Sequence, residues 1–180
     1  MKKIKNLLMI IIFAVVLTAC GKTNEQKIET KGKCNVFECI KKISSTNTLE
    51  EMNKIIGFDG ENSYESNTST TYKWKLSEDT SIEATINKES KKATLKIWYP
   101  SKMITKYANF SKWDEIEKKY KSTSGITYDE IVKLVGNVEG TLSGKSDLQL
   151  TYNWYDENNG YMFAYINPKT NKCTLASGRF

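Results

Sequence analysis

Two stretches of the chain alternate apolar and polar residues with a period of two. They read TYKWKL at residues 71–76 and LQLTYNW at residues 148–154. Successive side chains of a β-strand point to opposite faces of a sheet, so the alternation predicts strands with one buried face. Further apolar segments follow at residues 82–86 and 93–97, and at residues 162–166 and 173–177. With turn signals such as Asn158-Asn159-Gly160, each region predicts an antiparallel sheet of three or four strands.

Amphipathic helices are predicted before each sheet. Apolar residues recur at helical spacing in residues 48–57 and 127–136, and in the shorter stretches 36–43 and 113–120. Residues 48–57 and 127–136 begin with a threonine followed three residues later by a glutamate, which is the capping-box spacing, and both end at a glycine. The capping residues are Thr48, Glu51, Thr127 and Glu130. Each region therefore opens with two short helices.

The two regions match each other in register. TYKW at residues 71–74 and TYNW at residues 151–154 are 80 positions apart, and the pair ATIN and AYIN, at residues 84–87 and 164–167, keeps that offset. A chance tetrapeptide match would not keep its register on both sides, so the pattern indicates a tandem duplication. We therefore predict an α+β protein of two tandem helix-loop-helix plus antiparallel β-sheet repeats. Helices on one face of such a sheet leave the other face available.

The segment GITYDEIVKLVG, residues 125–136, and the Thr-Tyr-x-Trp strand after it resemble motifs of the beta-lactamase inhibitory protein family and related bacterial envelope lipoproteins. The resemblance spans roughly residues 34–180 and is stronger in the second repeat. It implies that the sheets form a concave surface, and it implies inhibition of an enzyme as one function of that surface. The chain departs from the family because the loops after Gly57 and Gly136 contain no cysteine. Asp59 does not align with the aspartate that the inhibitor inserts into its target, so that role is not transferred.

The N-terminus is predicted to be a targeting segment. Three lysines precede an apolar run of 11 residues, 7–17, and Leu-Thr-Ala stands directly before Cys20. The run is too short to cross a bilayer and is typical of a secretory signal. Its end resembles a bacterial lipoprotein signal, which implies cleavage before Cys20 and acylation of that residue. A protein so modified is anchored to the cell membrane on the extracytoplasmic face. The alternative is a secreted protein in which Cys20 has no special role.

These boundaries divide the chain into four parts. Residues 1–19 form the predicted signal peptide, and the polar, aperiodic residues 20–33 form a flexible tether. Residues 34–100 and 101–180 form the first and second repeats. The formal net charge of +6 falls to +3 once the three signal lysines are removed. The remaining lysines alternate with acidic residues, so the sequence contains no basic stripe for nucleic acid.

Three cysteines follow Cys20, namely Cys34, Cys39 and Cys173. Their odd number leaves at least one unpaired, and their pairing is open at this stage. A bond between Cys34 and Cys39 requires Cys34 to lie before the helix begins. The chain contains no histidine, which excludes histidine-based triads and metal sites. Adjacent carboxylates are typical of a solvated surface, and no phosphate loop is present. We therefore expect a non-enzymatic protein without a cofactor.

The polar sides of the duplicated strands differ. The first repeat presents Ser81, Glu83 and Thr85, whereas the second presents Tyr161, Phe163 and Tyr165. On the last strand of each repeat, Trp98 shares a side with Thr94, and Phe180 is expected to share a side with Thr174. Exposed aromatic clusters mark interaction sites, so Tyr161, Phe163, Tyr165 and Trp98 form our candidate protein-binding patch. The alternative is that these rings pack against the other repeat or the linker at residues 101–110.

The sequence hypothesis is thus a lipid-anchored protein that binds a partner protein of the envelope, such as an enzyme that it inhibits or modulates. Two other classes stay open. One is a structural or assembly lipoprotein of the cell envelope. The other is a small-ligand or peptidoglycan-binding module, in which the same aromatic residues would stack on a ring or a sugar.

Overall fold

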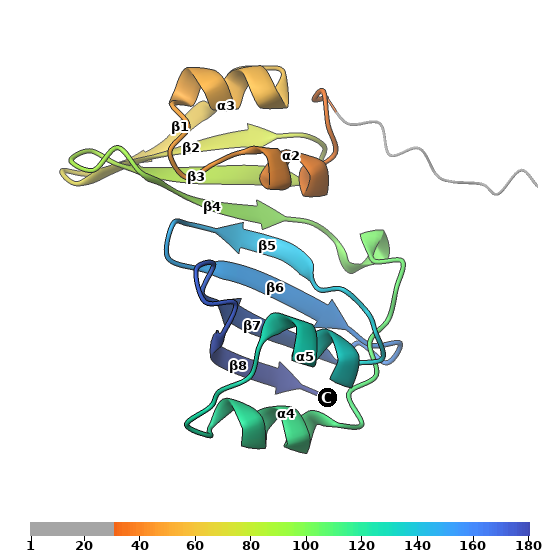
Figure 1. The fold of residues 1–180 in the computed structure, drawn as a ribbon. Coiled ribbons are helices and arrows are strands. Elements are labelled where there is room, and N and C mark those ends of the chain that lie inside the picture. The colour runs from red at the N-terminus through yellow and green to blue at the C-terminus, as the bar shows by residue number, and fades with distance from the viewer. Residues whose placement is uncertain (1–30) are drawn as a thin grey trace, which may run out of the picture.

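The computed structural model describes residues 31–180 (Figure 1). The predicted signal peptide, Cys20 and residues 20–30 of the predicted tether lie outside the described residues. Within residues 31–180, no helix combines the length and the apolar character needed to cross a membrane. Backbone hydrogen bonds attach the start of this part to the fold, because the Lys31 amide donates to the Leu76 carbonyl at 2.9 Å and the Lys33 amide donates to the Ile56 carbonyl at 2.7 Å.

Each half of the described chain consists of two helices followed by four strands. The first half contains α2 (Val36–Lys42), α3 (Leu49–Ile56), β1 (Glu61–Glu65), β2 (Ser69–Lys75), β3 (Ser81–Asn87) and β4 (Ala93–Trp98). The 3-10 turn η1 (Ser101–Met103) leads to α4 (Trp113–Tyr120), α5 (Tyr128–Leu134), β5 (Thr141–Lys145), β6 (Leu150–Tyr155), β7 (Tyr161–Ile166) and β8 (Cys173–Arg179). The predicted α+β class is confirmed.

All eight strands form one antiparallel sheet in chain order, from β1 to β8 (Figure 1). We expected a separate sheet in each half, but β4 pairs with β5 and joins the two parts. We also expected polar loops after the helix-ending glycines, where the structure has β1 and β5. Every residue of β1 is exposed, and a bulge interrupts the pairing of β5. Neither strand therefore carries a period-two apolar pattern that the sequence could reveal.

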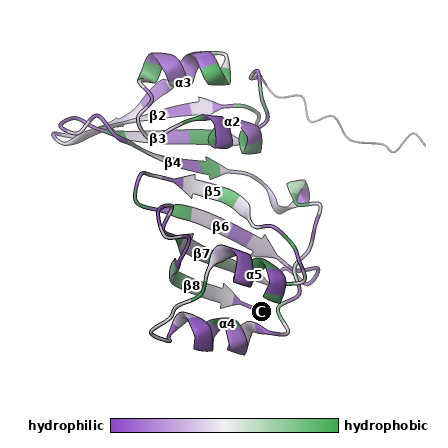
Figure 2. Cartoon of the chain, in the orientation of Figure 1, coloured by the Kyte–Doolittle hydropathy of each residue, from purple (hydrophilic) through white to green (hydrophobic). Residues whose placement is uncertain are grey.

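Local hydrogen bonds explain where α3 and α5 begin. The Thr48 hydroxyl accepts from the Glu51 amide at 3.2 Å, and the Glu51 carboxylate accepts from the Thr48 amide at 2.9 Å. Thr127 and Glu130 make the same reciprocal pair at 3.3 and 2.9 Å, so both predicted capping boxes are confirmed. Gly57 follows α3 with φ of +104°, a left-handed conformation that glycine adopts without strain. Figure 2 shows hydrophilic and hydrophobic residues side by side on the helices, as expected for amphipathic helices.

The position at which α2 begins explains which cysteines form the disulfide. Asn35 caps the helix, because its side-chain oxygen accepts from the amides of Phe37 and Glu38. Cys34 therefore lies before the helix, which is the condition that pairing with Cys39 requires. The two cysteines form a disulfide with their Cα atoms 5.6 Å apart, and this bond fastens the chain to the first turns of α2.

The aromatic residues of TYKW and TYNW lie on the helix side of the sheet, which is its buried face. Trp74 is fully buried and Trp154 is 2% exposed. The indole rings lie against Gly60 and Gly140, where an added Cβ would come within 2.5 and 2.6 Å of ring carbons. Both positions therefore require glycine, because any larger residue would displace the ring from the core.

The sheet carries two hydrophobic cores on its helix side. The first joins α2 and α3 to β2, β3 and β4, and the second joins α4 and α5 to β6, β7 and β8. Helix α2 also packs on β5, so it covers the junction between the halves. Leu150 and Tyr152 on β6 contact both cores. The four α-helices of residues 31–180 lie on this side, and we call the opposite side the open face.

Candidate binding face of the sheet

Strand register assigns residues to the open face. On β7, Met162, Ala164 and Ile166 are buried on the helix side, and the residues between them point the other way. These residues are Tyr161, Phe163 and Tyr165, and we call them the aromatic row. On β3 the same parity places Ser81, Glu83 and Thr85 on the open face, where Thr85 is exposed and Glu83 is half-buried, whereas Ser81, paired with Trp98, is buried. The predicted contrast between a polar strand and its aromatic counterpart is therefore a feature of the folded chain.

The rings of the aromatic row contact one another along β7. Tyr161 and Phe163 are stacked with centroids 6.3 Å apart and planes inclined by 18°. Phe163 and Tyr165 are 5.3 Å apart and inclined by 47°. Tyr161 retains 41% of its surface exposed, and the other two rings are half-buried. The row is thus a surface feature and lies outside the two cores.

Trp98 lies on the same face, at the end of β4. It pairs with Ser81 of β3 and is 48% exposed. The Lys96 ammonium lies 3.9 Å from the centroid of the indole ring, within the range of a cation–π interaction. As predicted, Trp98 and Thr94 share the open face, because the strand alternates strictly between buried and exposed residues.

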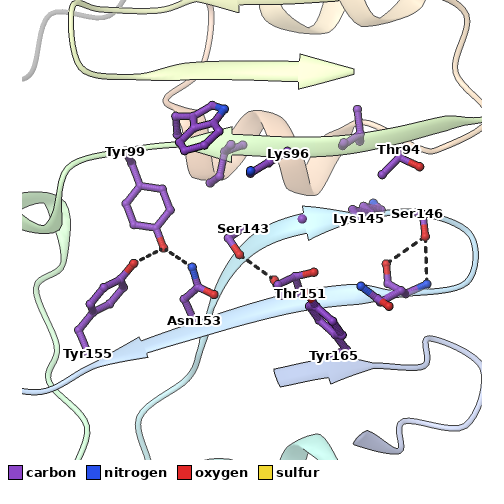
Figure 3. A pocket seen from close by; sticks show the side chains of 15 residues that line it. Thr94, Lys96, Tyr99, Ser143, Lys145, Ser146, Thr151, Asn153, Tyr155 and Tyr165 are labelled. Atoms are coloured by element: carbon purple, nitrogen blue, oxygen red, sulfur yellow. Dashed lines mark hydrogen bonds between the residues drawn. The ribbon is translucent and has the colours of Figure 1, made fainter. Parts of the chain in front are cut away.

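A groove separates Trp98 from the aromatic row. The ladder between β4 and β5 contains two residue pairs, Leu95 with Lys145 and Lys96 with Gly144, whereas β3 and β4 share six. The strands part beyond these pairs and leave a cavity of about 460 Å³, which we call the seam groove (Figure 3). Trp98 and Tyr165 both line it, so the structure brings two of the four predicted residues to one groove. Phe163 and Tyr161 continue the row beyond it on β7.

Tyr99 closes one end of the seam groove (Figure 3). Its hydroxyl lies 3.3 Å from the Tyr155 hydroxyl and accepts from the Asn153 side-chain amide at 3.3 Å. Its ring packs edge-on against Phe37 of α2 at 4.9 Å. Burial, reinforced by the Tyr155 hydroxyl, raises the pKa of Tyr99 far above its usual value. Tyr99 therefore stays neutral, and its hydrogen bonds link the end of β4 to β6.

A glycine lies at the bottom of the seam groove, and residues with hydroxyl groups line its sides. An added Cβ at Gly144 would lie 3.0 Å from the Thr151 hydroxyl oxygen, so the glycine keeps this part of the floor low. The polar residues that line the groove include Thr94, Ser143, Thr151 and Asn153. No aspartate or glutamate lines it. The arrangement offers aromatic surfaces, hydroxyl and amide groups, and a cation at Lys96.

Charge on the open face is uneven. From β4 to β8, the residues that the register places there include the cations Lys96 and Arg179 and no carboxylate. On the neighbouring strand β3, the Glu83 carboxylate pairs with Lys73 at 3.0 Å. Burial is the largest single influence and acts to raise the pKa of Glu83, but the hydrogen bonds from Lys73 and Trp98 and the charges of Lys73 and Lys96 together outweigh it, so the pKa is lowered. The aromatic row thus lies between two cations that would favour a negatively charged partner.

Two other ionisable groups do not add chemistry to this face. The Lys145 ammonium points to the helix side and donates to the Lys41 carbonyl at 3.4 Å, and burial lowers its pKa. Burial raises the pKa of the Cys173 thiol to about 11, so this cysteine is protonated at neutral pH and is a poor nucleophile.

Sequence reasoning missed part of this site and misplaced one residue. Tyr99, Asn153 and Tyr155 were not predicted, because their contact depends on how β4 and β6 lie across the junction. Phe180 was expected on the open face with Thr174, and this is wrong. A bulge at Thr174 shifts the parity of β8, so Leu175 faces Tyr165 and Phe180 packs on the helix side, 5.1 Å from the Trp113 ring.

Comparison of the chain with protein-family models, curated protein sequences and solved structures finds no match. The likeness to the beta-lactamase inhibitory protein family therefore rests on the sequence motifs alone.

Proposed function

We propose that this protein is a lipoprotein, anchored through Cys20 to the extracytoplasmic face of the cell membrane, that binds another envelope protein with the open face of its sheet. It acts by binding rather than by catalysis. The observation that carries the proposal is the aromatic row on β7, which stands at the positions where β3 carries Ser81, Glu83 and Thr85.

The aromatic row has the properties of a protein-binding surface. Rigid aromatic side chains supply large contact areas at a low entropic cost, and they are frequent in the centres of protein interfaces. Neither core requires the row, since Met162, Ala164 and Ile166 fill the helix side of β7. The flanking cations Lys96 and Arg179 would add attraction for an acidic partner.

The resemblance to the beta-lactamase inhibitory protein family supports a more specific version. In that version the chain arose by tandem duplication, the open face is concave, and the partner is an enzyme that the protein inhibits or modulates. The repeated order of two helices and four strands is consistent with duplication. The different open faces would mean that the second copy acquired the binding role.

Capture of the partner tests the proposal. Full-length protein, cross-linked in intact cells and purified, should retain one stoichiometric envelope protein. The double variant Phe163→Ala and Tyr165→Ala should lose that protein while its melting temperature stays within a few degrees of the parent. Alanine at Glu83 and Thr85, the matched positions on β3, is the control and should retain it. Equal capture by all three proteins would rule out the aromatic row as the binding site.

The anchor needs a separate test. Substitution Cys20→Ser should move the protein from the membrane fraction to the soluble extracytoplasmic fraction or leave it unprocessed, and labelled palmitate should no longer be incorporated. Incorporation of label into the variant would contradict lipidation at Cys20.

The seam groove favours one other candidate function, which is binding of a peptidoglycan sugar. Trp98 and Tyr165 offer ring surfaces on which a sugar can stack, and Asn153 and Thr151 offer hydrogen-bonding groups. Soluble peptidoglycan fragments titrated into the protein should then quench tryptophan fluorescence, and Trp98→Ala should abolish the change. A partner protein retained by Trp98→Ala but lost with the aromatic row would separate the two functions.

A further inference from the structure

A second cavity lies on the helix side of the first half, away from the open face. It has a volume of about 350 Å³ and lies between the N-terminus of α3, strands β2 and β3, and the turn that follows β3. We call it the helix-side cleft. Its apolar lining comes from Leu49, Tyr72 and Ile86, each of which is only partly buried. Its volume is at the lower end of the range found for small-molecule sites.

The second half fills the matching place with its own side chains. Thr70 pairs with Ile86 in the first half, and Leu150 pairs with Ile166 in the second. The Ala93 amide donates to the Ser45 carbonyl, whereas the equivalent Cys173 amide donates to the carbonyl of Ile126, which is fully buried. Ile166 is accordingly 1% exposed, whereas Ile86 is only partly buried. We attribute the cleft to Thr70, which stands where the second half has Leu150 and leaves Ile86 less covered than Ile166.

Polar groups at the rim of the cleft are already satisfied by their own loops. The Asn47 side chain accepts from the Ser44 amide at 2.6 Å and donates to Glu51 at 3.1 Å. The Asn87 side chain accepts from the Glu89 and Ser90 amides. These groups leave little demand for a polar ligand, so the interior of the cleft suits an apolar one.

The mouth of the cleft is positively charged. Lys88 and Lys91 line it, and no carboxylate does. Lys88 pairs with Glu65 at 2.7 Å, whereas Lys91 makes no ion pair within residues 31–180. Lys91 has φ of +58°, and Asn171 occupies the corresponding turn position in the second half with φ of +57°. The first half thus places an unpaired cation beside an unfilled apolar cleft.

We propose that the helix-side cleft binds an aliphatic monocarboxylate, the chemical class of medium-chain fatty acids. The aliphatic tail lies against Leu49, Tyr72 and Ile86, and the carboxylate meets the Lys91 ammonium. This site lies on the opposite side of the sheet from the aromatic row, and it does not depend on the function proposed for that row.

Methyl NMR of the full-length protein in phospholipid nanodiscs tests the proposal, with octanoate as the probe. The methyl signals of Leu49 and Ile86 should shift saturably, while those of Ile126 and Ile166 in the second half should not. Octanol, which lacks the charge, should bind about 2- to 5-fold more weakly, as expected from the loss of one exposed ion pair.

Two variants borrow the residues of the second half. Thr70→Leu should fill the cleft and weaken octanoate binding at least about 10-fold, because the tail loses its space. Lys91→Asn should leave octanol binding unchanged and reduce octanoate binding to the level of octanol. The melting temperature of Thr70→Leu should equal or exceed that of the parent, and if this variant fails to fold, Lys91→Asn still decides the role of charge. The proposal is overturned by the absence of a saturable shift, by equal shifts in both halves, or by unchanged octanoate binding in a folded Thr70→Leu or in Lys91→Asn.

Discussion

The two halves of the sheet place matching residues against the helices and different residues on the open face. Trp74 and Trp154 are both buried over a glycine, and the helices that precede them, α3 and α5, both start with a capping box. Across the sheet, the polar residues Glu83 and Thr85 correspond to Phe163 and Tyr165. The same arrangement of helices and strands thus occurs with a polar and with an aromatic open face, and we expect the second half to fold without the aromatic row.

The two buried tryptophans also differ in the acceptor of their indole N–H group. The Trp74 indole donates to the Asn53 side chain at 2.9 Å, whereas the Trp154 indole donates to the Val138 carbonyl at 2.8 Å. A buried N–H group must find an acceptor, but either a side chain or the backbone can provide it. Both halves therefore provide an acceptor for the buried indole N–H, but the first half uses a side chain and the second half uses the backbone.

The largest expected effect concerns the two buried tryptophans that the halves share. Alanine at Trp74 or at Trp154 should lower the free energy of unfolding by about 3 to 5 kcal/mol, because each change leaves a large cavity in a core. Urea unfolding followed by circular dichroism measures the loss. Similar losses would support equivalent cores, and a loss below about 1 kcal/mol for one of them would show that its half does not depend on the tryptophan.

The two halves differ in their disulfide content, because Cys34 and Cys39 are bonded in the first half and the described second half has no disulfide. Replacing Cys34 and Cys39 together with alanine should destabilise the protein by about 2 kcal/mol, as expected for release of a short loop. Hydrogen exchange should show faster exchange in α2 and little change in α4 and α5. Equal acceleration in the helices of both halves would mean that the bond stabilises the whole sheet through the contact of α2 with β5.

Exchange of the open faces tests the difference directly. A variant in which Tyr161, Phe163 and Tyr165 become Ser, Glu and Thr should lose the partner protein and about 1 kcal/mol of stability, the contribution of two exposed ring contacts. The reciprocal variant, with Phe at Glu83 and Tyr at Thr85, is the control and should keep the original partner. A stability loss above about 3 kcal/mol in the first variant would instead assign the aromatic row to the core.

The smallest expected effect concerns the two capping boxes. Backbone hydrogen bonds from Thr48 and Thr127 lower the pKa of Glu51 and Glu130 below the ordinary value of 4.5. A lowered carboxyl pKa contributes stability above the unfolded-state pKa, and that contribution is lost as the pH falls through the folded-state pKa. Glu51→Gln and Glu130→Gln should each reduce the loss of stability below about pH 4.5. A pH-stability profile unchanged by both substitutions would contradict this role.

Particular residues show how far the sequence could be used for prediction. The helices at residues 48–57 and 127–136 were predictable because caps and apolar spacing are local signals. Strand β1 was not predictable, because all five of its residues are exposed and its pairing with β2 leaves no apolar pattern. Phe180 was misplaced because one extra residue in β8 reverses every later side chain, and nothing in the local composition marks that bulge.

The same limit applies to the candidate sites. The aromatic row was predictable, since parity along a single strand decides which side chains share a face. The seam groove was not, because it depends on how far β4 and β5 remain paired. The helix-side cleft depends on volumes contributed by Leu49, Thr70 and Ile86, which are distant in sequence, and the burial of Ile166 at the matching place in the second half becomes apparent only when both halves are packed.

The amino-acid sequence by itself determined the α+β class, the two helices that open each half, the capping boxes and the faces of β3 and β7. These properties follow from hydrophobic periodicity and from hydrogen bonds between residues a few positions apart. Only the tertiary structure decided that β4 and β5 join the halves into one sheet, that they part to form a groove, and that Tyr99 reaches Asn153 and Tyr155. Those features depend on the relative placement of strands from different halves, and long-range packing sets that placement without leaving a local pattern.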